Sequence, residues 1–401
     1  MYIKQLTVEG VRNLESSQRL EVARHINLLS GQNGAGKTSI LEAIYILGRG
    51  RSYRGRSIRS VINSGAEVKR CTVFGLLGKE SHGKESGISR ADLRIGVSRE
   101  TNGGYRFKVD GEVVTSSSAL AEALPLVLIN TESFQLLAGG PQNRRRYLDW
   151  GLFHTSAAFR DAWRQQQRVL RHRNALLKQG VGSNKHAELD GWDEQFAVLS
   201  EQITELRRNY LGEIELIILR VLDSLSALEG ISFYYYQGWD SGKSLKEVLK
   251  TGRERDIVLG SSQYGPHRAD MRIRFINHKA ADILSRGQTK SLVMAMMIAQ
   301  AMHYRDQTGN TSVFLIDDLP AELDGEHQHK VAQLLVETGC QVFITGTDAD
   351  QLLAPWQALA RGKQDANSGI IAARNIVDGV HCTERSIKLF HVKQGVVSSP
   401  G

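Results

Sequence analysis

The sequence has few cysteines and no long apolar run, and each shortage excludes a class of protein. Its 401 residues contain three scattered cysteines, an odd number with no C-x-x-C pair, which argues against a disulfide framework and against a zinc site. The most apolar stretches, such as 214–222, are interrupted by charged residues and fall short of the ~20 residues of a membrane span. The first six residues are typical of an opening strand rather than a secretion signal. We therefore expect a cytoplasmic protein without a membrane segment.

Acidic residues are outnumbered by basic ones. The chain has 43 Asp and Glu against 51 Lys and Arg, a formal net charge of +8. This excess favours polyanionic partners but identifies none by itself. Hydrophobic residues make up 41% of the chain, which is ordinary for a globular protein, and its length predicts roughly two or three domains.

The most informative segment is 31–38, G-Q-N-G-A-G-K-T, which fills the pattern G-x-x-x-x-G-K-[ST] without a mismatch. In this pattern backbone N–H groups surround the phosphates, the lysine reaches the β- and γ-phosphates, and the hydroxyl ligates Mg²⁺. An apolar run at 25–29 precedes the loop and helical spacing at 39–47 follows it, which is the order that phosphate binding requires. The sequence therefore predicts a nucleoside triphosphate and Mg²⁺ site on Gly31, Gln32, Asn33, Gly34, Ala35, Gly36, Lys37 and Thr38.

A second part of such a site lies far down the chain. The apolar run 313–316 fits a central parallel strand and ends in Asp317 and Asp318. Asp317 is placed to hold Mg²⁺, together with Thr38, and Asp318 to orient the attacking water. A strand that ends in two acids is common, but beside a phosphate loop it predicts a catalytic set of Lys37, Asp317 and Asp318.

Two further segments narrow the class of ATPase. Residues 284–288, L-S-R-G-Q, precede an apolar helix at 292–299 and resemble the L-S-G-G-Q signature of ABC-type ATPases. There a serine hydroxyl and helix N-terminal amides meet the γ-phosphate held by the other subunit. The alternative is a turn that only caps a helix. Residues 321–324, A-E-L-D, stand where ABC ATPases carry a dimer-contact loop. We expect nucleotide contacts across a dimer from Ser285, Arg286, Gly287 and Gln288.

Departures from the general ABC pattern predict slow hydrolysis. The strand 341–345 leads to Gly-Thr-Asp and not to a switch histidine, and the catalytic acid is Asp318 rather than a glutamate. Both changes should leave the attacking water less well positioned, and catalysis is sensitive to small misplacements. The loop that senses the γ-phosphate has no clear motif, and its best candidate is 131–135, after the strand 124–129.

The middle of the chain has a different character. Apolar residues from Trp192 to Val221 recur every three or four positions, which predicts a long helix packed along a partner at 147–178, with 179–185 as the turn. In the first lobe, strands at 73–77 and 93–97 flank a polar stretch at 78–89, and Asp110-Gly111 predicts a hairpin.

We therefore expect an α/β fold: an ABC-type ATPase head, with a phosphate loop, a mixed sheet and an antiparallel lobe, that carries an inserted α-helical arm. The predicted segments are 1–140 and 231–401 for the head and 141–230 for the arm.

Basic residues gather near 49–59, along the start of the arm, and around 261–274. The arm arginines have i, i+4 spacing and share a face, which is either merely solvated or a track for DNA phosphates. The candidate DNA-binding residues are Arg51, Arg54, Arg56, Arg144, Arg145, Arg160, Arg164, Arg168, His267 and Arg268.

Along its whole length the chain resembles the RecF family of bacterial recombination-repair ATPases. The most specific segments are G-R-G-R-S-Y-R at 48–54, G-G-P at 139–141 and Y-G-P-H-R-A-D at 264–270. The signature arginine and the missing switch histidine, odd for a general ABC protein, look normal for this family. The resemblance implies a head of the SMC/Rad50 group that binds ATP and Mg²⁺, is a weak DNA-stimulated ATPase and dimerises with ATP. It also implies sequence-independent DNA binding at gaps and single-strand–duplex junctions, partnership with RecR in loading RecA, and a part in replication repair and the SOS response.

Two other functions stay open at this point. A transporter motor subunit would need a membrane-coupling surface, and it leaves the arm arginines unexplained. A binding scaffold with ATP-shaped motifs but no turnover is disfavoured by Asp318.

Overall fold

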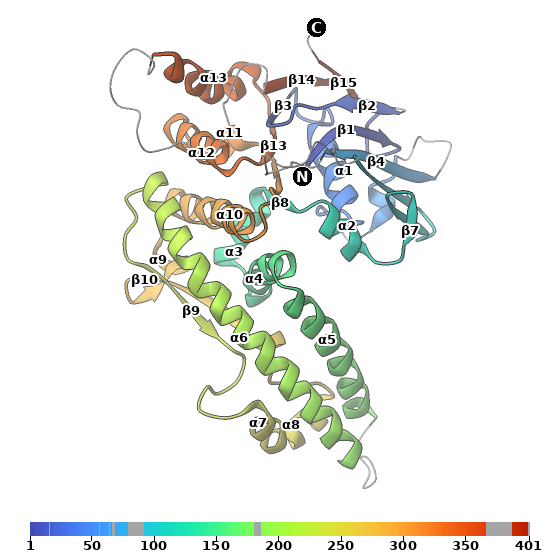
Figure 1. Cartoon of the computed structure of the whole chain (residues 1–401), viewed down its shortest axis with the longest axis vertical. Coiled ribbons are helices and arrows are strands. Elements are labelled where there is room, and N and C mark those ends of the chain that lie inside the picture. The colour runs from blue at the N-terminus through green and yellow to red at the C-terminus, as the bar shows by residue number, and fades with distance from the viewer. Residues whose placement is uncertain are drawn as a thin grey trace, which may run out of the picture. The chain divides into compact units, whose positions relative to one another are not determined.

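The computed structural model describes residues 1–15, 17–55, 57–63, 65, 69–78, 92–179, 186–365 and 387–399. The chain folds as two compact units. Unit 1 comprises Met1–Ser133 and Met296–Gly401, and unit 2 comprises Phe134–Ala295. The chain thus builds part of unit 1, completes unit 2 and returns (Figure 1).

The first sheet of unit 1 is antiparallel, in the order β2-β1-β4-β5-β6-β7. Its tightest turn uses Asp110 and Gly111, with φ of 51° and 88°, so the Asp-Gly hairpin is confirmed. Most of the predicted polar loop at 78–89 lies outside the described residues. The strands are β1 (Tyr2–Glu9), β2 (Gln18–Glu21), β4 (Arg70–Gly78), β5 (Leu93–Glu100), β6 (Tyr105–Val109) and β7 (Glu112–Val114).

The second sheet of unit 1 has the order β15-β14-β3-β13-β12-β8. It is parallel except for the edge strand β15, which pairs antiparallel with β14. The apolar run predicted as a central strand, β12, is buried at every residue, and so is β3, the strand before the phosphate loop. Parallel neighbours bring their carboxyl ends to one edge, and that edge will carry the site. The strands are β3 (Ile26–Ser30), β8 (Leu126–Ile129), β12 (Val313–Ile316), β13 (Gln341–Gly346), β14 (Ile387–Lys393) and β15 (Val396–Ser398).

Helix α1 (Lys37–Arg49) packs against strands of both sheets, and its fully buried Ile40, Ile44 and Leu47 belong to their shared core. Helix α13 (Ala349–Asp365) packs on β3 and β13. This arrangement confirms the predicted α/β head with a mixed sheet and an antiparallel lobe. The other helices of unit 1 are α2 (Ser117–Ala123), α11 (Leu319–Glu322), α12 (Gly325–Thr338) and η1 (Ile58–Ser60), while η2 (Thr131–Phe134) crosses the boundary between the units.

Unit 2 is built on a long helix, α6 (His186–Leu225), which runs beside α5 (Ala157–Lys178) (Figure 1). The 40 residues of α6 extend about 60 Å at 1.5 Å per residue. Its buried side includes Phe196, Ile203 and Ile214, so the predicted apolar stripe is confirmed as core packing.

The predicted partner helix at 147–178 is not continuous, which corrects that expectation. It is divided between α4 (Pro141–Thr155) and α5 by Ser156, which has extended backbone angles. The Ser156 hydroxyl accepts a hydrogen bond from the Phe159 N–H at 3.1 Å, so it starts a new helix instead of continuing the old one.

The segment after the arm also differs from the expected division. Residues 231–295 belong to unit 2, because β9 (Ile231–Tyr236) packs on α6 and β10 (Asp270–Phe275) packs on α4. Among the described residues, no helix is apolar enough over sufficient length to cross a membrane. The remaining elements of unit 2 are α3 (Gln135–Ala138), α7 (Leu245–Thr251), α8 (Arg253–Leu259), η4 (Pro266–Arg268), β11 (His278–Lys279), α9 (Ala280–Ile283) and the first part of α10 (Arg286–Thr308).

Candidate nucleotide site and basic surfaces

The glycine-rich loop joins the buried strand β3 to the first turn of α1, as the sequence predicted. Gly31 has φ of +157°, and a Cβ there would lie 2.2 Å from the Val392 carbonyl oxygen. Gly36, with φ of +115°, is the N-cap of α1. A side chain at either position would disturb the loop, and the loop leaves helix N-terminal N–H groups available to an anion.

Lys37 is the first residue of α1 and is only 8% exposed. Its ammonium donates hydrogen bonds to the carbonyl oxygens of Gly31 at 2.7 Å and Gln32 at 3.0 Å. Burial lowers the pKa of Lys37, while the charges of Asp318 and Asp317 act in the opposite direction. The loop thus holds a cation where the phosphates of a nucleotide would need one.

Thr38 and Asp317 meet although they are 279 residues apart. The Thr38 hydroxyl donates to Asp317 Oδ1 at 3.0 Å, and the Thr345 hydroxyl donates to the same oxygen at 2.7 Å. Hydroxyl and carboxylate oxygens are the hard ligands that Mg²⁺ prefers, so this donor set fits the ion. Within the described residues there is no cluster of three His, Cys, Asp or Glu that could hold a metal instead.

Thr345 is a site residue that the sequence interpretation missed. It directly follows Ile344, the last β13 residue that pairs with β12. Because Ile344 pairs with Ile316, Thr345 lies opposite Asp317. Its hydroxyl also accepts the Asp318 N–H at 2.8 Å, which holds Asp318 in a left-handed conformation with φ of 57°. The available signal was the pairing of the two predicted parallel strands, because the carboxyl ends of neighbouring parallel strands lie side by side.

Asn13 braces the phosphate loop from outside the motif. Its side-chain amide donates to the Gly34 carbonyl at 2.8 Å, and its side-chain oxygen accepts the Ser39 hydroxyl at 2.9 Å. The Gly395 N–H donates to the Ala35 carbonyl at 2.9 Å. Both ends of the chain therefore support the loop, and no local motif marks either contact.

The arginine-rich segment after α1 is folded onto that helix by a buried glutamate. Glu42, with a fully buried side chain, accepts two hydrogen bonds from Arg12 at 2.8 and 2.9 Å. It also accepts the Ser52 hydroxyl, which in turn accepts the Arg54 N–H at 2.9 Å. Arg51 and Arg54 are exposed and stay DNA-binding candidates, although Arg54 also lies 4.0 Å from Glu42, while Arg56 lies outside the described residues.

The signature segment begins α10 in unit 2. The Gln288 N–H donates to the Ser285 hydroxyl at 3.2 Å, and the Ser285 N–H donates to the Gln288 side chain at 2.9 Å, a capping box. Helix capping, the alternative named above, is therefore one role of Ser285. All four signature residues are exposed, so a contact with nucleotide across a dimer stays a prediction. The candidate sensing residues at 131–135 follow β8, whose Ile129 carbonyl accepts the Asp317 N–H at 2.9 Å.

The structure gives Arg144 an internal role instead of a place on a DNA surface. Its guanidinium is buried and donates to Asp270 at 2.7 and 3.1 Å and to the Gly139 carbonyl at 2.7 Å. Arg145 is half-buried and donates to the Ala269 carbonyl at 2.6 Å. These two arginines hold the helical arm to β10, a role that residue type alone does not show.

The arm arginines divide into held and exposed ones. Arg160 donates to the Phe153 carbonyl at 2.7 Å and lies 5.9 Å from the centre of that ring. Arg164 pairs with the exposed Asp161 at 3.5 Å, so part of the charge on this face is compensated. Arg168 is exposed, as is Arg268 in the third cluster. A basic face remains, on which Arg168 has no carboxylate partner among the described residues.

His267, a candidate DNA ligand, is largely enclosed. Its Nε2 lies 2.9 Å from the Ser262 carbonyl, so this nitrogen carries the proton and donates. Burial lowers the pKa of His267 to about 4, so the ring is neutral near pH 7.

This pKa predicts how stability depends on pH. Between about pH 4 and the usual pKa near 6.5, the unfolded imidazole binds a proton that the folded one does not, so stability rises with pH. We expect His267→Gln to lose part of this rise while it keeps a donor for Ser262. Urea unfolding at pH 4.5 and 6.5, followed by tryptophan fluorescence, measures it, since Trp150, Trp163, Trp192 and Trp239 all lie in unit 2. An identical pH dependence in both proteins would contradict the assignment.

Comparison with known proteins gives a consistent result. The family model described as RecF/RecN/SMC N terminal domain matches residues 2–365. The chain is 40% identical over 398 residues to the DNA replication and repair protein RecF of Pseudomonas putida strain F1, covering 99% of this chain and 98% of that protein. The protein of the same name from Pseudomonas fluorescens strain SBW25 is 39% identical, with the same coverage.

Solved structures agree on the fold. The recombination mediator protein RecF-ATP superposes with a TM-score of 0.79 at 24% identity, covering 100% of this chain and 98% of that one. The Smc head bound to the C-winged helix domain of ScpA superposes with a TM-score of 0.58 at 14% identity, covering 100% and 97%. The fold is that of an SMC-type ATPase head.

Proposed function

This chain belongs to the RecF family of DNA replication and repair proteins, and from that premise we propose that it is an ATP-dependent DNA-binding protein of recombinational repair and replication restart. The observation that best supports the proposal is the set of Lys37, Thr38 and Asp317 at the carboxyl edge of a parallel sheet. Lys37 meets the β- and γ-phosphates of ATP, and Thr38 and Asp317 hold Mg²⁺. When bound, the ion neutralises charge on the phosphates.

The chain's own residues set the rate of hydrolysis in this proposal. Asp318 is exposed next to the ligand carboxylate, and it orients the attacking water. Its short side chain and the absence of a histidine at 346–348 give a weak ATPase, which DNA stimulates by steadying the closed state. In this proposal ATP hydrolysis determines when DNA is released, and it does not supply the energy for DNA binding.

The signature segment supports ATP-driven dimerisation of two copies. Ser285 and Arg286 are exposed at the N-terminus of a long helix, where donors face any anion brought to them. In the closed dimer they complete the site of the other copy and bring basic surfaces together. The proposed clamp holds DNA at gaps and junctions, independent of sequence, because arginines on phosphates position a protein without reading bases. With a RecR-type mediator it helps to load a RecA-type recombinase in the cytoplasm and so supports the SOS response.

Two substitutions separate nucleotide binding from assembly. Ser285→Arg should still bind ATP but remain monomeric, because the larger side chain fills the space of the partner's phosphate. Asp318→Asn should bind ATP and persist as a dimer, because release is slowed. Size-exclusion chromatography with light scattering, with and without ATP, measures both.

The matched control is Ser285→Thr, which keeps a hydroxyl at the helix cap and should dimerise like the natural chain. ATP-dependent dimers of Ser285→Arg would refute the composite site. A single-turnover assay of phosphate release distinguishes a slow ATPase from a binding scaffold without turnover. The other alternative, an ABC transporter motor subunit, is disfavoured because it leaves the basic helical arm unexplained.

A further inference from the structure

The small sheet of unit 2 has one packed face and one open face. Its strands lie in the order β11-β10-β9, and Phe233 and Met271 point into the core. On the other face the side chains of Tyr234 and Tyr236 are 52% and 37% exposed. Three cationic residues beside them are exposed, and together with the two tyrosines we call them the outer face: Tyr234, Tyr236, Arg272, Arg274 and Lys279.

Each arginine of the outer face is stacked on a tyrosine. The guanidinium carbon of Arg272 lies 4.7 Å from the centre of the Tyr236 ring, and that of Arg274 lies 5.1 Å from the Tyr234 ring. Stacking holds a guanidinium plane in place without using its N–H donors. The face therefore carries two ordered, flat cations whose hydrogen-bonding groups are available to a ligand.

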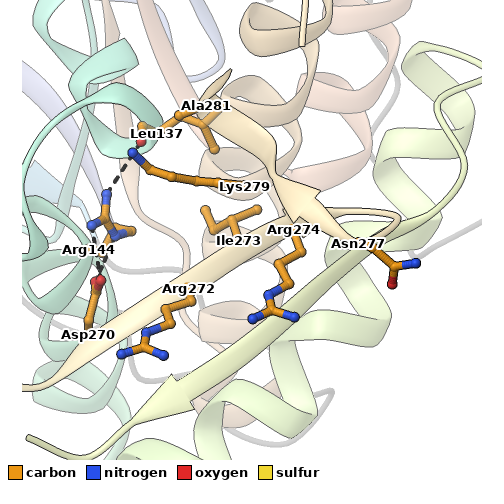
Figure 2. A pocket seen from close by; sticks show the side chains of 9 residues that line it. All are labelled: Leu137, Arg144, Asp270, Arg272, Ile273, Arg274, Asn277, Lys279 and Ala281. Atoms are coloured by element: carbon orange, nitrogen blue, oxygen red, sulfur yellow. Dashed lines mark hydrogen bonds and ion pairs between the residues drawn. The ribbon is translucent and has the colours of Figure 1, made fainter. Parts of the chain in front are cut away.

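A hollow of about 290 Å³ adjoins these arginines beside β10, and Arg272 and Arg274 project to the same side of the strand (Figure 2). The acid in its lining, Asp270, already accepts two hydrogen bonds from Arg144. Lys279 lies 3.5 Å from an exposed carboxylate, that of Asp282. Among the described residues neither Arg272 nor Arg274 has a carboxylate partner, so the lining has an excess of positive charge that an anionic ligand would neutralise.

We propose that the outer face binds single-stranded DNA, an inference that rests on the proposed DNA-binding function. The phosphates lie along Arg272, Arg274 and Lys279, and the bases stack on the two tyrosine–arginine pairs. Tyr234 and Tyr236 are two residues apart on one strand, about 7 Å, a separation that neighbouring unstacked bases can span. In a duplex the faces of the bases are stacked on one another and cannot reach a protein ring. Exposed rings would contribute nothing to a surface that binds phosphates alone, so the two tyrosines favour a single strand as the ligand.

The test compares DNA binding of the full chain by fluorescence anisotropy at several salt concentrations, with a non-hydrolysable ATP analogue present. Arg272→Ala/Arg274→Ala should weaken binding to a single-stranded oligonucleotide on the order of tenfold or more. The slope of log affinity against log salt should become shallower by about 0.7 for each phosphate that the variant no longer neutralises. Tyr234→Leu/Tyr236→Leu should weaken binding to the single strand more than to a duplex of the same length.

The matched control is Arg220→Ala/Arg255→Ala, which removes the same charge from exposed positions elsewhere in unit 2. Equal effects of the two double arginine variants would overturn the proposal that the outer face binds DNA, while DNA binding by the protein itself would stand. This result is expected if the face binds an acidic protein instead. Equal losses for single strand and duplex in the tyrosine variant would overturn the single-strand assignment. Failure of the unaltered chain to bind any DNA would overturn the proposed function itself.

Discussion

Lys37→Ala is expected to abolish ATP binding, with affinity reduced by at least about 100-fold, because the buried ammonium is the cation at the mouth of the phosphate loop. The substitution should leave the fold intact, because within the described part of the chain the ammonium donates to two loop carbonyl oxygens alone, those of Gly31 and Gln32. Isothermal titration calorimetry with ATP and Mg²⁺ measures the affinity, and circular dichroism checks the fold. Lys37→Arg should also bind poorly, because a planar guanidinium does not fit a site that holds a compact cation.

The matched control is Lys108→Ala, which removes an exposed lysine from β6 and should leave ATP affinity unchanged. ATP affinity of Lys37→Ala equal to that of the control would remove the basis of the nucleotide site. Dimerisation in ATP should disappear together with binding in this variant, whereas Ser285→Arg should lose dimerisation alone. The two variants therefore report on different steps.

The arrangement of the candidate nucleotide site could be predicted because its residues lie in short, contiguous motifs. The glycine loop, Lys37 and Thr38 lie in one segment, and the apolar run before Asp317 marks a buried strand. Local spacing decides these contacts. Thr345 and Asn13 could not be found in the same way, because their contacts to Asp317 and Gly34 depend on how distant segments pair.

The role of the arginines was the least predictable part. Arg144, Arg160 and Arg168 are equivalent in a count of charge, yet the first is buried against Asp270, the second is held by a carbonyl, and the third is exposed. Tertiary packing makes this distinction, since a guanidinium can serve either as an internal cross-link or as a phosphate ligand. Exposed and buried residues alternate along β9 and β10, so the sequence does place the tyrosines on one face of their strand and the arginines on one face of theirs. The pairing of the two strands is what brings Tyr234 and Tyr236 beside Arg272 and Arg274.

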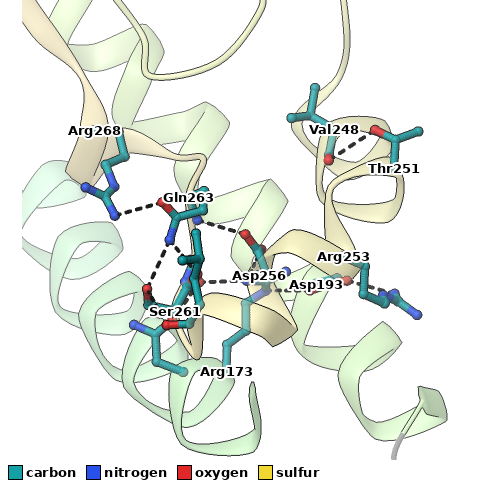
Figure 3. A network of polar contacts seen from close by, with 12 residues as sticks. Arg173, Asp193, Val248, Thr251, Arg253, Asp256, Ser261, Gln263 and Arg268 are labelled. Atoms are coloured by element: carbon teal, nitrogen blue, oxygen red, sulfur yellow. Dashed lines mark hydrogen bonds and ion pairs between the residues drawn. The ribbon is translucent and has the colours of Figure 1, made fainter. Parts of the chain in front are cut away.

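Arg173 is the clearest case of an internal arginine. It stands in the basic first part of the arm, but its side chain is fully buried and takes part in a network of polar contacts (Figure 3). It donates to Asp193 at 2.6 Å, to Asp256 at 2.7 Å and to the Ser262 hydroxyl at 2.7 Å. Asp256 is also fully buried and accepts the Gln263 N–H at 3.0 Å. The network therefore ties α5 to α6, to α8 and to the segment before β10.

Arg173→Met is accordingly expected to destabilise unit 2 by about 3–5 kcal/mol, because it leaves the fully buried Asp256 carboxylate without its cation and Asp193 with Arg253 alone. Urea unfolding followed by tryptophan fluorescence measures the loss. The matched control is Arg171→Met on the same helix, where an exposed side chain should contribute within about 0.5 kcal/mol. Adding Asp256→Leu to Arg173→Met should recover much of the stability, since it removes the stranded charge while Asp193 keeps Arg253 as its partner. A cost for Arg173→Met no larger than that of the control would mean that the buried ion pairs do not hold the arm together.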